Sequence, residues 1–372
     1  MHVLLLDTEK TWAGGQLQVQ LLLSGLIQRG VEAHLAAACH GELRDRTQGT
    51  VPLLPIKVRN DLDPLAVFSL ARYCRQRHID LIDAHSARAH SIGAWTKMLL
   101  PETRLVVHRH IDLPPQPSLG NRFLYGTHRV DRFVAISEKI RQVLLDYNID
   151  ANRINVVRSA VDPAPFNQLD RGEARPRLAR ELNIPPERTL LGTAGQLAGY
   201  KDHSMLLRAL KILQDSAVES HCVIAGEGNR RTALESEIVQ LGLDSAVTLL
   251  GFRRDIPDLL AALDVFVMPS RTEGLGLAVL EAFHAGTCVV ATSAGGIPEM
   301  VIAGKTGLLS APGDSVAFAA NLAQAIANPR LRQSLAMEAR NFAFREFSLD
   351  AMVEGNLALY QEIISKNTKP RT

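Results

Sequence analysis

Short apolar runs recur along the chain, and longer stretches with helical spacing of apolar residues separate them. Runs of this kind are typical of strands that are covered on both faces of a parallel sheet. The helical stretches complete βαβ units, so we predict an α/β protein with parallel sheets. The predicted strands are residues 3–7, 33–38, 81–85, 104–108, 132–136, 154–157, 190–194, 221–225, 247–250, 265–268 and 288–291.

The alternation is interrupted between residues 158 and 188, where proline-rich segments flank a charged helical stretch. Such a segment is typical of a linker between domains, and 372 residues suffice for two α/β domains. We therefore predict a Rossmann-like domain over residues 1–165 and a second over residues 166–348. Ligands of such sheets bind at the carboxyl ends of the strands, so the crevice between the domains is the expected site.

The first predicted strand leads through a glycine-containing loop, residues 7–16, into a predicted helix over residues 17–28. Gly14 and Gly15 would let backbone N–H groups approach a ligand, and the start of the helix favours an anion such as a diphosphate. The spacing differs from the G-x-G-x-x-G dinucleotide pattern. A glycine turn that only introduces a helix explains the same residues equally well.

The most informative stretch is residues 268–283, in which a predicted strand leads through a glycine-rich loop into a helix that begins near Gly276. Glu273 lies in that loop, and the adjacent helix N-terminus is suited to phosphate. Glu281 lies further along the helix among apolar residues, where an unpaired carboxylate is costly. A ribose diol would satisfy this carboxylate, and a buried arginine is the structural alternative.

Glu273 and Glu281 form the E-x7-E signature of retaining glycosyltransferases with the two-domain GT-B fold, and the chain resembles glycosyltransferase family 4. The resemblance covers essentially the whole chain and is strongest from residue 192 to 313. It implies an acceptor-binding first domain, a donor-binding second domain facing it across a cleft, and a terminal segment, 349–372, whose helix returns to the first domain. The motifs that carry the resemblance are residues 14–15, 135–138, 195–202, 225–228, 273–281, 295–299 and 304–309.

The resemblance also implies roles for individual residues. Lys201 is expected to bind the donor diphosphate and Glu281 the ribose, while Glu273 contacts the transferred sugar. His110 lies where the family places a histidine beside the anomeric carbon, with His108 as the alternative. The catalytic candidates are His110 and Glu273, and the donor-binding candidates are Gly14, Gly15, Gln196, Lys201, Gly226, Glu227, Phe252, Arg253, Gly274, Leu275, Gly276 and Glu281.

Gln196 departs from the family pattern G-R-L-x-x-x-K-G, which has arginine at this position. Glutamine keeps a hydrogen bond but loses the positive charge toward the diphosphate, and charge-assisted hydrogen bonds are about twice as strong as neutral ones. Arg158, Arg253 or Arg254 would have to compensate. Weak activity, an unusual donor and an inactive protein are the possibilities that Gln196 leaves open.

Glycosyl transfer places negative charge on the departing diphosphate, which Lys201, the helix after Gly276 and the Gly14–Gly15 loop are expected to stabilise without a metal ion or cofactor. The resemblance implies retention of configuration, with a UDP-, GDP- or ADP-sugar as the substrate. Two other motifs are predicted to be structural. Residues 61–63 resemble a D-x-D metal site but are expected to cap a helix, and residues 304–306 resemble the end of a P-loop but are expected to form a turn.

The charge of the chain narrows its partners. The net charge of +2 does not favour nucleic acid, yet residues 1–165 carry 20 Lys and Arg against 16 Asp and Glu. This excess suits an anionic glycan or glycolipid acceptor such as lipopolysaccharide, or peripheral contact with a membrane through a stretch such as residues 121–130. Ordinary variation in surface charge explains this excess equally well, and a solvated helix face is the favoured interpretation of residues 121–130. With no signal peptide, no long uncharged apolar run and four widely spaced cysteines, a cytoplasmic protein is expected.

Two other functions fit the same motifs. A nucleotide-sugar epimerase can share this architecture, and a non-catalytic nucleotide-sugar-binding protein would suit Gln196. The combination of Glu273 and Glu281 with the Lys201 loop favours the transferase. His85 and His90 follow a predicted strand, and contact with the acceptor and simple placement in a loop are equally good explanations for them.

Overall fold

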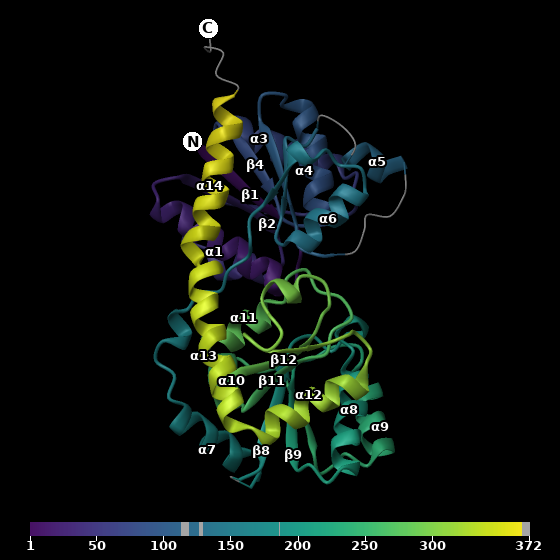
Figure 1. Cartoon of the computed structure of the whole chain (residues 1–372). Coiled ribbons are helices and arrows are strands. Elements are labelled where there is room, and N and C mark those ends of the chain that lie inside the picture. Colours follow the sequence, from purple (N-terminus) through teal and green to yellow (C-terminus); the bar gives the residue numbers. More distant parts are fainter. Residues whose placement is uncertain (113–118, 126–128, 186, 367–372) are drawn as a thin grey trace. The chain divides into compact units, whose positions relative to one another are not determined.

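The chain divides into two compact α/β units in the computed structural model, which describes residues 1–112, 119–125, 129–185 and 187–366. The first unit contains Met1–Ala160 and Leu349–Thr372, and the second contains Val161–Ser348 (Figure 1). The boundary between them therefore lies inside the proline-rich segment. Each unit is built around one parallel sheet.

The sheet of the first unit has seven parallel strands in the order β3-β2-β1-β4-β5-β6-β7. The order reverses between β1 and β4, and in doubly wound sheets ligands bind beyond the carboxyl ends of the strands at such a reversal. The strands are β1 (His2–Asp7), β2 (Glu32–Ala38), β3 (Leu53–Ile56), β4 (Leu81–Ala84), β5 (Arg104–Arg109), β6 (Arg132–Ala135) and β7 (Ile154–Val156).

One face of this sheet is covered by the first and the last helix of the chain, which lie side by side (Figure 1). A Cβ on Gly25 would lie 2.4 Å from Val353 Cγ2, so glycine at this position lets the two helices approach closely. The C-terminal helix thus belongs to the first unit. The helices of this unit are α1 (Gly14–Gln28), α2 (Glu42–Thr47), α3 (Pro64–Gln76), α4 (Ala87–Leu99), α5 (Leu119–Tyr125), α6 (Glu138–Asp146) and α14 (Leu349–Ser365).

The sheet of the second unit has six parallel strands in the order β10-β9-β8-β11-β12-β13, with the reversal between β8 and β11. The strands are β8 (Thr189–Ala194), β9 (Ser220–Ala225), β10 (Val247–Gly251), β11 (Val265–Met268), β12 (Cys288–Thr292) and β13 (Leu308–Ser310).

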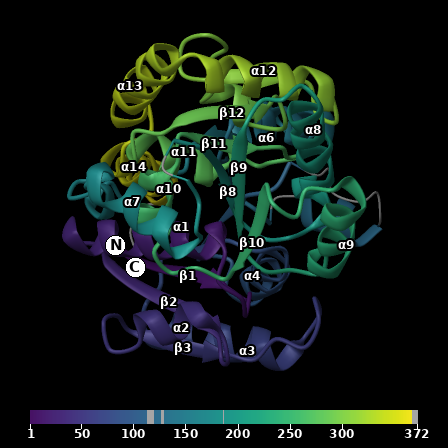
Figure 2. The same cartoon turned by 90° about the horizontal axis from the view of Figure 1, so that it is seen from below.

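Helices cover both faces of this second sheet. Leu206 and Leu210 of α8, Leu234 of α9 and Phe318 of α12 belong to one buried apolar cluster on one face. Figure 2 shows α8 and α9 on the opposite side of the strands from α10 and α11. The helices are α7 (Arg171–Glu181), α8 (His203–Asp215), α9 (Arg231–Leu241), α10 (Ile256–Ala262), α11 (Leu277–His284), α12 (Ser315–Ala327) and α13 (Pro329–Glu346).

All the predicted strands are present, each within one residue of its predicted ends, which confirms the α/β prediction with parallel sheets. Two further strands, β3 and β13, were not predicted from the sequence. Both lie at an edge of their sheet. Strand β3 contains Pro55, which disfavours a strand interior, and β13 has only three residues.

The two motifs predicted to be structural are confirmed as such. The Asp63 carboxylate accepts hydrogen bonds from the Leu65 and Ala66 N–H groups, so it caps α3 with Pro64 in the first turn. Residues 304–306 form a turn.

Membrane contact was one interpretation of the basic and aromatic stretch 121–130, and a solvated helix face was the favoured one. This stretch lies partly outside the described residues. Among the described helices, none combines the length and the apolar composition that crossing a bilayer requires.

Candidate active site

The loop between β8 and α8, residues 195–202, is held by the loop that follows β9. The Gly195 N–H donates to the Ala225 carbonyl at 2.9 Å, and the Leu197 N–H donates to the Glu227 carbonyl at 2.9 Å. A Cβ on Gly226 would lie 1.8 Å from the Gly195 carbonyl oxygen. Since Gly226 also has a φ of +144°, the packing of these two loops requires glycine there.

Lys201 and Glu273 form an ion pair at the carboxyl ends of β8 and β11. Lys201 Nζ lies 2.7 Å from Glu273 Oε1, which also accepts a hydrogen bond from Ser270 Oγ at 2.7 Å. The two charged side chains are mostly buried, with 16% and 11% of their areas exposed. Lys201 Nζ also lies 3.8 Å from the position of a Cβ on Gly195. The ammonium group therefore sits where the two predicted donor-binding loops meet.

A second glycine contact fixes the loop that carries Glu273. A Cβ on Gly295 would lie 1.7 Å from the Glu273 carbonyl oxygen, and the Gly296 N–H donates to that oxygen at 3.2 Å. The loop ends at Gly276, whose φ of +95° favours glycine, and α11 begins at Leu277. The first N–H groups of a helix have no partner inside it, so they are available to an anion.

Glu281 projects from α11 with no hydrogen-bond or ion-pair partner among the described residues. Burial raises the pKa of Glu281 to about 7, and the positive charge of Lys201 acts in the opposite direction. The arginine partner that the sequence allowed as an alternative is absent from the described part of the chain. Gly274 is half-buried and Leu275 is buried in the loop before this helix.

Gln196 is exposed, and its side-chain oxygen accepts a hydrogen bond from the Tyr200 hydroxyl at 3.3 Å. Of the arginines that were expected to compensate, Arg253 is held elsewhere. It bonds Asp255 through Nε at 2.9 Å and Nη2 at 2.7 Å, and it also bonds Glu181. These partners, Asp255 first, raise the pKa of Arg253.

The remaining donor-binding candidates of the second unit are more exposed. Phe252 has 69% of its area exposed. Glu227 is also exposed and accepts from Arg231 Nη1 at 2.8 Å. Arg254 is exposed, and Arg158 belongs to the first unit.

Asp202 was not singled out from the sequence, although it replaces the last glycine of the family pattern. Asp202 has a φ of +47°, in the left-handed region that glycine adopts readily and that aspartate tolerates. Aspartate can therefore occupy the position where the family pattern has glycine. Its carboxylate caps α8 through the Met205 N–H and accepts from Arg271 Nε at 2.7 Å. The Arg271 N–H in turn donates to the Tyr200 carbonyl at 2.8 Å. These bonds join the loop of Lys201 to the loop of Glu273.

In the first unit, Gly14 and Gly15 form the first turn of α1, so the prediction that the helix starts at residue 17 was wrong. The cause is Gln16, whose Oε1 accepts from the Ala13 N–H at 3.1 Å and whose Nε2 donates to the buried Asp7 at 3.0 Å. A Cβ on Gly15 would meet nothing within 4 Å, so the backbone there faces open space.

A cluster of three histidines and an aspartate lies at the ends of β4 and β5. Asp83 pairs with Val106 across the two strands, and residues two apart along a strand share a face, so Asp83, His85, His108 and His110 lie on one face. His85 Nδ1 lies 3.3 Å from His110 Nε2.

Asp83 is the buried centre of this cluster. Its Oδ2 lies 2.9 Å from His85 Nε2, and it accepts a hydrogen bond from the hydroxyl of Tyr360 on α14. Asp83 and Tyr360 were not identified from the sequence. The period-two spacing D-x-H and H-x-H on neighbouring predicted strands was the available signal for the carboxylate.

The histidines that were considered as candidates from the sequence differ in their exposure to solvent. His108, the alternative to His110, is buried, whereas His110 is half-buried. Burial, with the charges of His85 and His108, lowers the pKa of His110 well below its usual range. His90 lies buried in α4, edge-on to Tyr125 with ring centroids 4.8 Å apart, so it is not in a loop.

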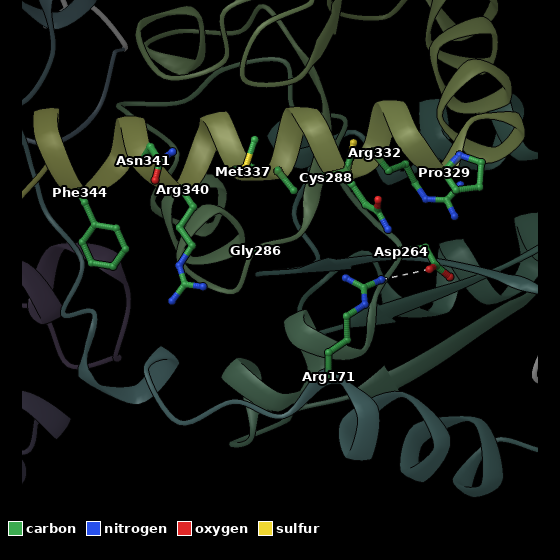
Figure 3. A pocket seen from close by; sticks show the side chains of 12 residues that line it. Arg171, Asp264, Gly286, Cys288, Pro329, Arg332, Met337, Arg340, Asn341 and Phe344 are labelled. Atoms are coloured by element: carbon green, nitrogen blue, oxygen red, sulfur yellow. Dashed lines mark hydrogen bonds and ion pairs between the residues drawn. The ribbon is translucent and has the colours of Figure 1, made fainter.

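Two cavities of the second unit are lined by none of the predicted site residues. The smaller one, of about 220 Å³, borders the Lys201 loop at Ala198, Gly199 and Asp202. The larger one, of about 740 Å³, lies along α13 and contains none of the predicted site residues. Figure 3 shows side chains that line it, among them Arg171, Asp264, Cys288, Arg332, Met337, Arg340 and Phe344.

Two doubly wound parallel units, with the last helix returned to the first unit and a lysine–glutamate pair at the strand ends of the second, define the GT-B type of glycosyltransferase. The profile of Glycosyl transferases group 1 matches residues 174–342, and that of Glycosyltransferase Family 4 matches residues 12–165. The chain therefore belongs to glycosyltransferase family 4.

Named relatives and a solved structure agree with this family. The chain is 24% identical over 309 residues to N-acetyl-alpha-D-glucosaminyl L-malate synthase of Bacillus anthracis, covering 81% of this chain and 80% of that enzyme. It is 35% identical over 252 residues to D-inositol 3-phosphate glycosyltransferase of Thermomonospora curvata, covering 63% of this chain and 57% of that enzyme. The crystal structure of Anabaena Alr3699/HepE in complex with UDP shares the fold, with a TM-score of 0.86 at 23% identity, covering 97% of this chain and all of that one.

Proposed function

We propose that this glycosyltransferase transfers a sugar, with retention of configuration, from a nucleotide-sugar donor to a cell-envelope glycan or glycolipid such as lipopolysaccharide. The observation that carries the donor half of the proposal is the Lys201–Glu273 ion pair with Glu281 nearby. It combines a cation for a diphosphate with a carboxylate that lacks a partner among the described residues.

The chemistry follows from these groups. The bond between the anomeric carbon and the diphosphate oxygen breaks, and its electron pair leaves with the diphosphate. Lys201 and the first amides of α11 stabilise that charge. An acceptor hydroxyl forms the new bond on the same face and gives its proton to a departing phosphate oxygen, so configuration is retained. Glu281 accepts hydrogen bonds from the ribose hydroxyls, and no metal ion is required.

The choice of substrates rests on charge and on the relatives. The solved Anabaena protein is in complex with UDP, so a UDP-sugar is the first donor to test, followed by GDP- and ADP-sugars. The relatives are named for L-malate and D-inositol 3-phosphate, which are both anions. An anionic acceptor also suits the excess of Lys and Arg in residues 1–165.

The proposal is tested by incubating the protein with UDP-glucose, UDP-N-acetylglucosamine, GDP-mannose and ADP-glucose in turn and measuring release of the nucleoside diphosphate. Slow release of the nucleoside diphosphate from one donor, accelerated by transfer to a lipopolysaccharide core acceptor and unchanged by EDTA, is the expected result. An epimerised donor without release of nucleotide would instead indicate the epimerase. Tight binding without any turnover would indicate an inactive protein, for which Gln196 is the specific cause to examine.

Peripheral membrane contact is proposed on the same excess of positive charge. We expect the protein to sediment with vesicles of phosphatidylglycerol more than with vesicles of phosphatidylcholine, and less so at high salt. Equal sedimentation with both would remove this part of the proposal.

A further inference from the structure

We infer that Asp83 and His85 are positioning residues that fix which ring nitrogen of His110 carries its proton, so that the other nitrogen accepts a hydrogen bond from a hydroxyl group of a bound sugar. The inference deepens the proposed function and rests on it, because the family resemblance places His110 beside the anomeric carbon of the sugar that is transferred. It adds a chain of three groups, Asp83, His85 and His110, to the site of the first unit.

The series of hydrogen-bonded groups begins at a carboxylate, which can only accept hydrogen bonds. Asp83 is completely buried, and its Oδ2 lies 2.9 Å from His85 Nε2 and 3.2 Å from His108 Nε2. Burial acts to raise the pKa of Asp83, but the two histidines outweigh it and hold the pKa below its ordinary value. An ionised carboxylate is an acceptor only, so His85 Nε2 must donate to it. The Tyr360 hydroxyl donates to the same carboxylate from α14.

The proton positions then follow along the chain. With the His85 ring neutral, as the inference requires, Nε2 donates and Nδ1 is the acceptor. His85 Nδ1 lies 3.3 Å from His110 Nε2, so the proton of His110 belongs on Nε2. The depressed pKa of His110, caused first by burial, agrees with a neutral ring. His110 Nδ1 is then an acceptor, and among the described residues it has no hydrogen-bond partner.

A metal ion is the other explanation for three clustered histidines, and the ring geometry disfavours it. The nitrogen lone pair that binds a metal lies in the plane of its ring. The rings of His85, His108 and His110 are nearly parallel, with interplanar angles of 21° to 27°, and the centroids of His85 and His108 are 4.2 Å apart. The in-plane lone pairs of His85 and His108, whose rings are stacked at that distance, do not converge on one ion. The hydrogen-bonded chain accounts for the contacts better.

The proton positions can be read without any substrate, by nitrogen NMR of the full chain with ring-labelled histidine. The His110 signals are assigned by their loss in His110→Gln. We expect His110 to carry its proton on Nε2 at neutral pH and to become a mixture of both tautomers in His85→Phe. The matched control is His108→Phe, because His108 stacks on the same rings but, among the described residues, makes no hydrogen bond to His110.

Three results would overturn the inference. They are a proton on Nδ1 of His110 in the unaltered protein, an unchanged His110 tautomer in a folded His85→Phe, and a stoichiometric metal ion whose removal shifts all three histidine signals. If His85→Phe does not fold, Tyr360→Phe keeps the ring and removes only a donor to Asp83. This variant is expected to shift the nitrogen signals of His85 and His110. Unchanged signals would contradict the proposed hydrogen bonds from Asp83 through His85 to His110.

Kinetics separate this inference from the proposed function. With the donor found by the screen, His85→Phe is expected to lower kcat at least about 10-fold, because the partner that orients a functional histidine is lost, while affinity for UDP stays the same. His108→Phe is expected to lower kcat less. If the protein turns over a donor and His85→Phe leaves kcat unchanged, the inference fails while the proposed function stands. Absence of turnover with every donor, alongside the expected tautomers, would defeat the proposed function alone.

Discussion

The ammonium group of Lys201 lies 2.7 Å from the Glu273 carboxylate, at the adjoining ends of β8 and β11. The positive charge that is expected to bind the donor diphosphate is therefore already paired in the free protein. A diphosphate must share Lys201 with Glu273 or draw it away, and Ser270 remains to satisfy Glu273 when it does.

Lys201→Met is expected to weaken UDP binding at least about 10-fold, because a hydrogen bond to a charged group contributes roughly 1.5–3 kcal/mol. Glu273→Gln removes the competing carboxylate and is expected to leave UDP binding equal or tighter, although turnover falls. Isothermal titration calorimetry with UDP measures both. Equal weakening by the two variants would show that the pair acts only as a structural unit.

Glu281 links stability to pH. The folded protein holds the Glu281 proton up to about pH 7, whereas the unfolded chain releases it near 4.5. The folded state therefore binds more protons in this window, so the free energy of unfolding falls as the pH rises through it. Glu281→Gln should be more stable than the unaltered protein at pH 8, by about 1–3 kcal/mol after allowance for partial exposure. Urea unfolding at pH 5 and pH 8 measures this.

The same variant should bind UDP more weakly, because an amide replaces the carboxylate that accepts from the ribose. Glu338→Gln on the exposed surface of α13 is the control, with an expected change in stability below about 0.5 kcal/mol at both pH values. If Glu281→Gln were less stable at pH 8 and bound UDP normally, Glu281 would be a structural residue.

Gln196→Arg restores the residue of the family pattern at an exposed position of the loop between β8 and α8. Because charge-assisted hydrogen bonds are about twice as strong as neutral ones, we expect roughly 3- to 10-fold tighter UDP binding, with a steeper dependence on salt. Gln240→Arg on the exposed face of α9 adds the same charge away from this loop and is expected to have little effect. Weaker binding by Gln196→Arg would place Gln196 away from the diphosphate.

Gly295→Ala tests the contact that fixes the Glu273 loop. A methyl group there would lie 1.7 Å from the Glu273 carbonyl oxygen, so the loop must move, at an expected cost of about 2–4 kcal/mol in unfolding free energy. Gly304→Ala has a similar left-handed φ but meets nothing within 4 Å, so it should cost only about 1–2 kcal/mol. Thermal unfolding compares them, and equal losses would mean that the backbone conformation alone matters at both positions.

The sequence was sufficient for most of the fold because its buried parallel strands are continuous apolar runs. It failed where that signal is weak, as at Pro55 in β3, or where a side chain changes a boundary, as Gln16 does at the start of α1. The loops of Lys201 and Glu273 could be found because each follows a predicted strand and has its glycine and charged residues in the order of a family motif.

Other parts of the site depend on contacts that no local pattern specifies. Tyr360 meets Asp83 across 277 positions of the chain. Arg253 is bound to Glu181 and Asp255, so its availability to a ligand could not be judged from its position in the motif. Asp202 occupies a glycine position because it can adopt a left-handed conformation while it caps α8 and pairs with Arg271.

The placement of α14 sets an order for biosynthesis. The sheet face under Val353 and Tyr360 belongs to strands that leave the ribosome early, yet the helix that covers it is made only after the whole second unit. Until then the nascent protein has an exposed apolar sheet face, and Asp83 lacks the hydrogen bond from Tyr360. The N-terminal half can therefore mature only after the whole second unit has been translated, and loss of the final helix would damage the part of the molecule that was made first.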